Sequence, residues 1–180
     1  MMHLYQSVLL NVIFAAYLSL TPESKACSPS PDYDTWKFIQ NFTKGYIKYK
    51  NYKDNRLCVG LRQLLAHNEQ YALYNSSFRT SPDTDIQSEL LLARVEGCSN
   101  VLSIYNNNAP AIYNATLVYS NGIYCAIFKS MLVFPEPHCA VWVNSIAGGD
   151  DIHDCIDHFT DACVAKEQDV YPNDICGQTP

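Results

Sequence analysis

The sequence predicts an all-β protein: an eight-stranded antiparallel up-and-down barrel with flanking helices, a short N-terminal helix and a C-terminal helix packed outside. Three observations indicate this fold. Short β-rich runs alternate with polar turns between residues 45 and 146, and a helical pattern of apolar residues stands on either side of them. Tyr is also abundant, with 13 residues against 7 Phe and 2 Trp, and strands favour such side chains.

The first predicted element is a helix over residues 34–43. Asp34 stands where an N-cap is expected, because its carboxylate can accept hydrogen bonds from the free N–H groups of the first turn. Apolar residues then recur at helical spacing. They are Trp36, Phe38, Ile39 and Phe42.

Eight strands are expected next, separated by polar turns such as Asn106-Asn107-Asn108 and Ser120-Asn121-Gly122. The predicted strands are residues 45–52, 57–65, 71–79, 86–96, 100–106, 111–119, 123–132 and 138–146. Consecutive strands joined by short loops are typical of an up-and-down barrel. A barrel of eight strands is the size that encloses one small ligand.

The last predicted element is an amphipathic helix over residues 150–166, which two Asp residues begin and whose apolar side packs on the outside of the barrel. His153 with Asp157, and Asp154 with His158, stand four residues apart on it, a spacing that can hold a divalent metal. Acidic residues also favour a helix N-terminus, and this structural reading is preferred. We expect no metal and no cofactor.

The N-terminal residues predict secretion. The apolar run at residues 8–20 is too short to span a bilayer, and small residues at Ser24 and Ala26 precede Cys27. We expect residues 1–26 to be a signal peptide and residues 27–180 the mature domain. A membrane anchor is the disfavoured alternative. The net charge of -6 argues against a nucleic-acid partner.

Eight cysteines in the mature part predict four disulfides, for which counting alone allows about 105 pairings. Cys125 and Cys139 lie on one predicted hairpin, and Cys155 and Cys163 lie two turns apart on the following helix. Pairing 125–155 and 139–163 would attach that helix to the barrel. Three sequons, at Asn41, Asn75 and Asn114, also fit a secreted glycoprotein.

The sequons also orient the strands. A glycosylated Asn faces solvent, so Asn75 and Asn114 outward place their neighbours inward. In the first strand, Lys48 and Lys50 are assigned to the outer face. The expected ligand-binding residues are Trp142, Phe128, Tyr113, Leu117, Tyr74, Phe78, Ile47 and Tyr49. Inward aromatics also fit a barrel filled by its own side chains.

Catalytic motifs are not recognisable. The sequence has no H-E-x-x-H, no Gly-rich phosphate loop and no G-x-S-x-G. A Cys–His nucleophile needs a free thiol, which eight paired cysteines do not leave. We therefore expect a binding protein and not an enzyme.

Motifs along nearly the whole mature chain resemble the tick salivary lipocalins of the histamine-binding-protein family. They are Asp34-Thr35-Trp36-Lys37, Leu57-Cys58-Val59-Gly60, Tyr124-Cys125-Ala126-Ile127, Cys139-Ala140-Val141-Trp142-Val143, the series Cys155, Phe159 and Cys163, then Val170-Tyr171 and Cys176. The resemblance implies an extracellular ligand-binding barrel with disulfides 125–155 and 58–176. With 139–163, this leaves Cys27 to pair with Cys98.

Amine-binding members of this family carry an inward Asp after the first of these strand cysteines and an inward Glu on the next strand. Here the matching residues are Ala126 and Ala140. A buried ammonium needs a buried anion, so the resemblance implies a neutral lipid such as cholesterol. Asp85 and Glu89 keep amine scavenging as an alternative.

The resemblance also implies action on host immune cells, dendritic cells in particular. A third alternative is an effector that binds an unidentified host protein and whose cavity is incidental. We expect a monomer.

Overall fold

The computed structural model describes residues 33–177 except 68–70, 96–99, 107–112, 131–136 and 164–167. The signal-peptide prediction and the Cys27–Cys98 pair lie outside these residues. The strands are β1 (Lys44–Lys50), β2 (Leu57–His67), β3 (Tyr71–Arg79), β4 (Gln87–Val95), β5 (Val101–Asn106), β6 (Tyr113–Ser120), β7 (Cys125–Ser130), β8 (His138–Asn144) and β9 (Gln168–Asp169). The helices are α2 (Thr35–Asn41), the 3₁₀ turn η1 (Asp150–Ile152), α3 (His153–Cys163) and α4 (Asn173–Cys176).

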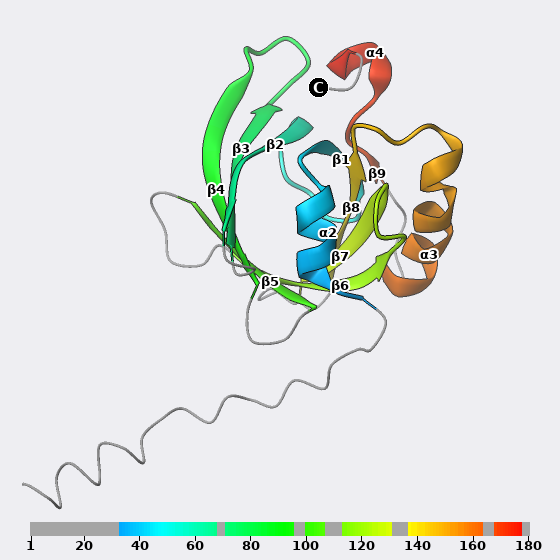
Figure 1. The fold of residues 1–180 in the computed structure, drawn as a ribbon. Helices are drawn as coiled ribbons and strands as arrows, with labels where there is room; N and C mark the ends of the chain where they lie inside the picture. Colours follow the sequence, from blue (N-terminus) through cyan, green and yellow to red (C-terminus); the bar gives the residue numbers. More distant parts are fainter. Residues whose placement is uncertain are drawn as a thin grey trace, which may run out of the picture.

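Strands β1 to β8 form a closed antiparallel barrel (Figure 1). Each strand pairs with its neighbours in sequence, and β1 closes the ring by pairing with both β2 and β8. The eight predicted strands are therefore confirmed, each within a few residues of its expected bounds. The two-residue β9 pairs with Tyr49 and Lys50 at the end of β1 and was not predicted.

Helix α2 closes one end of the barrel, and Figure 1 shows it lying across the ring of strands. The Asp34 carboxylate accepts hydrogen bonds from the N–H groups of Trp36 (2.9 Å) and Lys37 (3.1 Å), as the N-cap prediction requires. Phe38, Ile39 and Phe42 are buried in the same apolar cluster as the inward side chains of the strands. Their burial holds the short helix in place, since a helix this short is unstable alone.

Gly45 is the second residue of β1. A Cβ atom at this position would clash with the carbonyl oxygen of Val143 and with the ring of Phe42. Glycine is therefore required here by the close approach of β8 and not by a special backbone angle.

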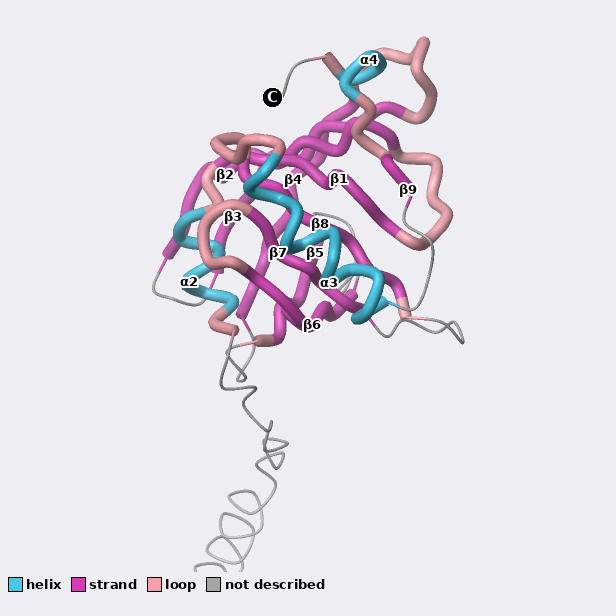
Figure 2. Tube along the Cα trace, turned by 90° about the vertical axis from the view of Figure 1, so that its right-hand side faces the viewer, coloured by secondary structure: helices cyan, strands magenta, loops and turns pink. Residues whose placement is uncertain are grey.

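Helix α3 packs on the outer face of the barrel over β6, β7 and β8 (Figure 2). Its buried residues are Cys155, Phe159 and Cys163. Disulfides Cys125–Cys155 and Cys139–Cys163 join it to β7 and β8, and Cys58–Cys176 joins α4 to β2. These three predicted pairs are confirmed.

No helix within the described ranges is long and apolar enough to cross a membrane.

Candidate functional site

The barrel encloses a cavity of about 320 Å³. This is near the lower end of the ~300–1,000 Å³ typical of small-molecule sites. The polar lining residues stand at the strand ends farthest from α2; Lys50, for example, ends β1 and Ser130 ends β7. The cavity therefore lies toward the end of the barrel that α2 does not close. The lining residues are Ile47, Lys50, Tyr52, Asp54, Arg56, Val59, Leu61, Ser76, Leu91, Ile104, Asn106, Ala115, Phe128, Ser130, His138, Ala140 and Trp142.

The deeper wall of the cavity is apolar. Trp142 of β8 lies beside Phe128 of β7, with ring centroids 4.9 Å apart. The Trp142 ring also packs against the ring of Phe42, the residue that follows α2, with centroids 5.5 Å apart. The indole therefore lies between the helix that closes the barrel and the space in which a ligand would lie. Aliphatic side chains from five other strands complete this wall.

The open end of the cavity carries charges that are paired with one another. Lys50, whose side chain is only 4% exposed, forms an ion pair with Asp54, and its Nζ also donates to the carbonyl oxygen of Arg56 at 3.0 Å. The Arg56 guanidinium pairs with Glu89 of β4 and lies 4.4 Å from the centre of the Phe78 ring. Two cations and two anions thus balance at the mouth of the cavity. The same ion pairs attach the loop between β1 and β2 to β1 through Asp54 and to β4 through Arg56.

Lys50 corrects the sequence prediction for the first strand. The pairing of β1 with β8 runs Ile47 with Trp142 but then Tyr49 with Val141 and Lys50 with Ala140, so one residue is extra in β1. A bulge of this kind reverses the side-chain alternation beyond it. Ile47 and Lys50 both face inward as a result.

Tyr49 consequently lies on the opposite face. It packs against the outer cluster, which contains Tyr46, Phe159 of α3 and Tyr171, and not in the lumen. The expectation that Tyr49 faces the lumen is therefore wrong, and Lys50 of the same strand lines the cavity instead.

Six of the other seven predicted ligand residues divide into two groups. Trp142, Phe128 and Ile47 line the cavity. Tyr74, Phe78 and Leu117 are buried in the interior cluster but lie outside the described cavity lining. For Tyr113 only the backbone is described, paired with Ile104.

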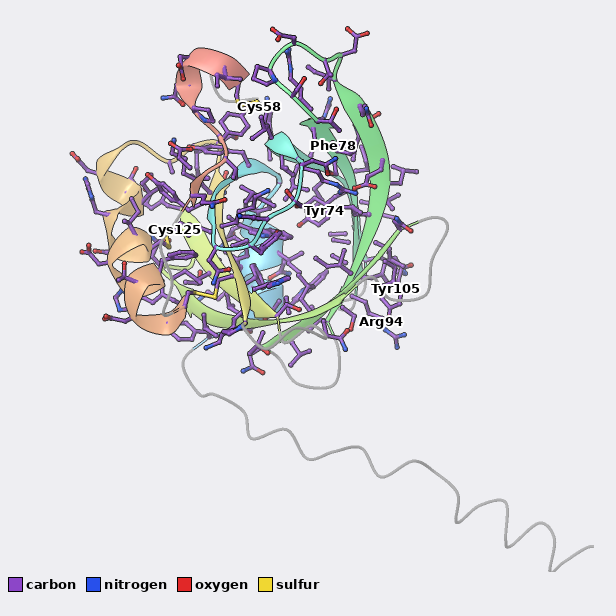
Figure 3. All side chains as sticks on the ribbon, turned by 180° about the vertical axis from the view of Figure 1, so that it is seen from behind. Cys58, Tyr74, Phe78, Arg94, Tyr105 and Cys125 are labelled. Atoms are coloured by element: carbon purple, nitrogen blue, oxygen red, sulfur yellow. A yellow bond between two sulfur atoms is a disulfide. The ribbon has the colours of Figure 1, made fainter. Side chains whose placement is uncertain are left out.

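Tyr74 has a structural task. Figure 3 shows it reaching into the barrel, whereas Arg94 and Tyr105 lie at its outer surface. Its hydroxyl donates to the carbonyl oxygen of Phe42 at 3.2 Å and accepts from the Gln63 amide at 3.1 Å. Burial raises the pKa of this phenol above its usual 10.0, and the hydrogen bond from Gln63 offsets the rise only in part. Tyr74 therefore ties the segment after α2 to β2 and β3.

Sequence reasoning missed the polar mouth of the cavity. Asp54 and Arg56 lie in a polar segment between β1 and β2 that reads only as a turn, and Lys50 lies after the bulge. Glu89, an acid that the sequence offers to an amine, pairs across the mouth with Arg56. Among the residues that the structure describes, no group of three or more His, Cys, Asp or Glu is placed to hold a metal ion.

The sequons lie on β3, β6 and the end of α2. Asn41 and Asn114 are exposed, and Asn75 is half-buried on the side of β3 that alternates with its buried residues.

Solved structures share this architecture. Japanin from Rhipicephalus appendiculatus bound to cholesterol matches with a TM-score of 0.57 at 15% identity, over 73% of this chain and 93% of that chain. The serotonin complex of AM182 matches with a TM-score of 0.66 at 12% identity, over 86% of this chain and 99% of that chain. Lobster apocrustacyanin A1 matches with a TM-score of 0.57 at 10% identity, over 74% of this chain and 78% of that chain. Identities this low show a common fold alone.

A closed eight-stranded barrel with a capped end, an outer helix and an internal cavity defines a lipocalin, a class of ligand-binding proteins. Residues 27–178 match the family described as tick histamine binding protein, so the chain belongs to that family. No curated protein sequence matches it significantly.

Proposed function

We propose that this protein is a secreted lipocalin that retains a neutral, mostly apolar ligand of sterol shape and acts on host immunity. The observation that carries the proposal is the charge balance of the cavity. Its deeper wall is mostly apolar, and its four flanking charges are already paired as Lys50 with Asp54 and Arg56 with Glu89. A neutral ligand can enter without separating either pair.

The two alanines support the same conclusion. Ala126 is fully buried in the interior cluster, and Ala140 lines the cavity where amine-binding relatives are expected to carry a carboxylate. Ala140 of β8 pairs in register with Lys50 of the neighbouring strand β1. A cation therefore stands next to the position that would have to attract an ammonium group, and like charges repel at this range.

The apolar wall can supply the affinity. At about 25 cal/mol per Å², burying ~300 Å² of ligand surface contributes about 7 kcal/mol before the cost of ordering the ligand. A net binding free energy of about 7–8 kcal/mol would correspond to a micromolar Kd, so this contribution sets an upper bound from these ~300 Å². The Japanin structure, solved with cholesterol, shows that a barrel of this fold can hold a sterol.

Amine binding is the second candidate, and Asp54 favours it because its carboxylate lines the cavity. The AM182 structure is a serotonin complex of the same fold. Here, however, an amine would have to take Asp54 from Lys50 and leave a buried ammonium without its partner, which is costly.

Lipid extraction of the secreted protein, combined with native mass spectrometry, tests the proposal. We expect the native mass to include one neutral lipid, released by organic solvent and identified in the extract. A protein that carries only a biogenic amine, or one that stays empty after exposure to sterols, would contradict it.

The proposed host target is the immune cell, with dendritic cells as the first to test. The lipid-loaded protein is compared with delipidated protein in a dendritic-cell maturation assay. A block of maturation by both forms equally would favour the alternative in which surface loops bind a host protein and the cavity is incidental.

A further inference from the structure

The cavity wall contains a buried hydroxyl group, that of Ser76, which makes no hydrogen bond within the described residues. Ser76 lies on β3 between Tyr74 and Phe78, on the inward face of the strand. It is fully buried and lines the cavity. Within the described part of the chain, no protein group makes a hydrogen bond to its Oγ.

Its neighbours do not provide a partner. Ser76 pairs in register with Leu61 of β2 and with Glu89 of β4. Leu61 has no polar side-chain atom, and the Glu89 carboxylate pairs with Arg56 and accepts no hydrogen bond from Ser76. A buried hydroxyl without a partner costs free energy, so its presence among apolar residues calls for a partner that the described residues do not provide.

Two other buried hydroxyls, one with a partner and one without, allow a comparison with Ser76. Ser130 also lines the cavity, but its Oγ donates to the carbonyl oxygen of Asn114 at 2.6 Å. Thr35 resembles Ser76 in being fully buried without a partner for its hydroxyl among the described residues, yet it does not line the cavity. Ser76 combines both properties, an unpartnered hydroxyl and a position in the cavity wall.

We propose that Ser76 is the hydrogen-bonding anchor of the ligand. The ligand then carries a hydroxyl or carbonyl group on an otherwise apolar frame, positioned to reach β3. This inference rests on the proposed function and makes it narrower, because a pure hydrocarbon would leave Ser76 Oγ unsatisfied. Ser76 acts as a specificity residue that distinguishes an oxygen-bearing lipid from its deoxygenated analogue.

The test compares two steroids that differ in one hydroxyl group, 5α-cholestan-3β-ol and 5α-cholestane. Both are delivered from cyclodextrin to delipidated protein, and binding is followed by tryptophan fluorescence, because Trp142 lines the cavity. For the wild type we expect the alcohol to bind about tenfold more tightly than the hydrocarbon, the range for one buried neutral hydrogen bond. In Ser76→Ala this ratio is expected to fall to about one.

Thr35→Val is the matched control. It removes a hydroxyl that is equally buried and unpartnered but lies outside the cavity lining, so the tenfold ratio is expected to persist. Thermal unfolding without ligand provides a second readout, in which neither substitution lowers the midpoint, because each removes an unsatisfied polar group.

Three outcomes are distinguishable. Loss of the ratio in Ser76→Ala alone supports the inference. An unchanged ratio in Ser76→Ala, with both steroids still bound, overturns the role of Ser76 and leaves the proposed function intact. If neither steroid binds, and neither 1-hexadecanol nor hexadecane does, the neutral-lipid function fails and this inference fails with it.

Discussion

Lys50 places a buried cation in the lining of the cavity. Its ammonium group is buried and faces the barrel interior opposite Ala140. It is held by Asp54 and by the carbonyl oxygen of Arg56. A carboxylate placed at residue 140 would therefore meet a cation that already has a partner.

Ala140→Glu tests this arrangement. The new carboxylate would add a negative charge to a lumen in which the charges balance, so we expect neutral-sterol affinity to fall at least tenfold and histamine affinity to become measurable. Competition binding with both ligands measures the change.

Ala140→Gln is the control, because Gln fills the same space without a charge. It should lower sterol affinity but gain no histamine binding. Equal histamine affinity in the two variants would contradict the electrostatic explanation.

Tyr74 predicts how stability depends on alkaline pH. Its pKa is raised in the folded state by burial, so its contribution to stability is complete below pH 10.0, the usual value, and is lost as pH rises toward the folded-state pKa. Above pH 10 the unfolded chain ionises there and the folded chain does not, which costs up to about 1.4 kcal/mol per pH unit.

Urea denaturation at about pH 8 and pH 11 measures this loss. Tyr74→Phe should be less stable than the wild type at the lower pH, because it loses the bonds to Phe42 and Gln63, yet it should lose less stability between the two. Tyr46, Tyr119 and Tyr171, whose pKa values are also raised, contribute equally to both proteins. Identical pH slopes would refute the role of Tyr74.

Side-chain direction was predictable only where a strand is regular. Alternation from Asn75 placed Tyr74 and Phe78 inside correctly, because β3 has no irregularity against β4. The same reasoning failed for Tyr49 and Lys50, because the bulge in β1 follows from its pairing with β8 and leaves no mark in the sequence.

At the scale of elements, disulfides hold α3 against the barrel. Cys125–Cys155 and Cys139–Cys163 close segments with sequence separations of 30 and 24 residues. The helix has a narrow buried side, so a large part of its attachment comes from these covalent links. The third pair, Cys58–Cys176, has a separation of 118 residues and fixes the C-terminal segment.

Loop-closure entropy ranks these bonds. Replacing Cys125 and Cys155 together by Ala should lower the free energy of unfolding by about 3–4 kcal/mol, and replacing Cys58 and Cys176 by about 5 kcal/mol. Urea denaturation of the two double variants measures the order. A larger loss for the 125–155 pair would show that helix packing, and not chain entropy, dominates.

The elements themselves were largely predictable, since turn residues and short β-rich runs mark each strand and Asp34 marks α2. Strand β9 was not, because Gln168 and Asp169 carry no alternation and pair only where β1 offers an edge. The helix expected over residues 150–166 begins as the short 3₁₀ turn η1 before α3 starts at His153.

For the whole molecule, the two barrel ends have different tasks. Helix α2 closes one end, where Phe38 and Phe42 are buried, and the charged residues Lys50 and Arg56 line the cavity at the other end. The net charge of -6 belongs to the whole chain and is not reproduced at the mouth of the cavity, where the charges cancel. Whether inward aromatics fill a barrel or line a cavity could not be predicted, because that depends on the space left after packing.

Calorimetric titration of histamine and serotonin into delipidated protein tests the central claim most directly. We predict no heat of binding above dilution for either amine, and no displacement of a preloaded sterol, because Asp54 and Glu89 are paired and Ala140 faces Lys50. Tight, strongly exothermic binding of either amine to the wild-type protein would contradict the neutral-ligand account and assign this lipocalin to the amine scavengers.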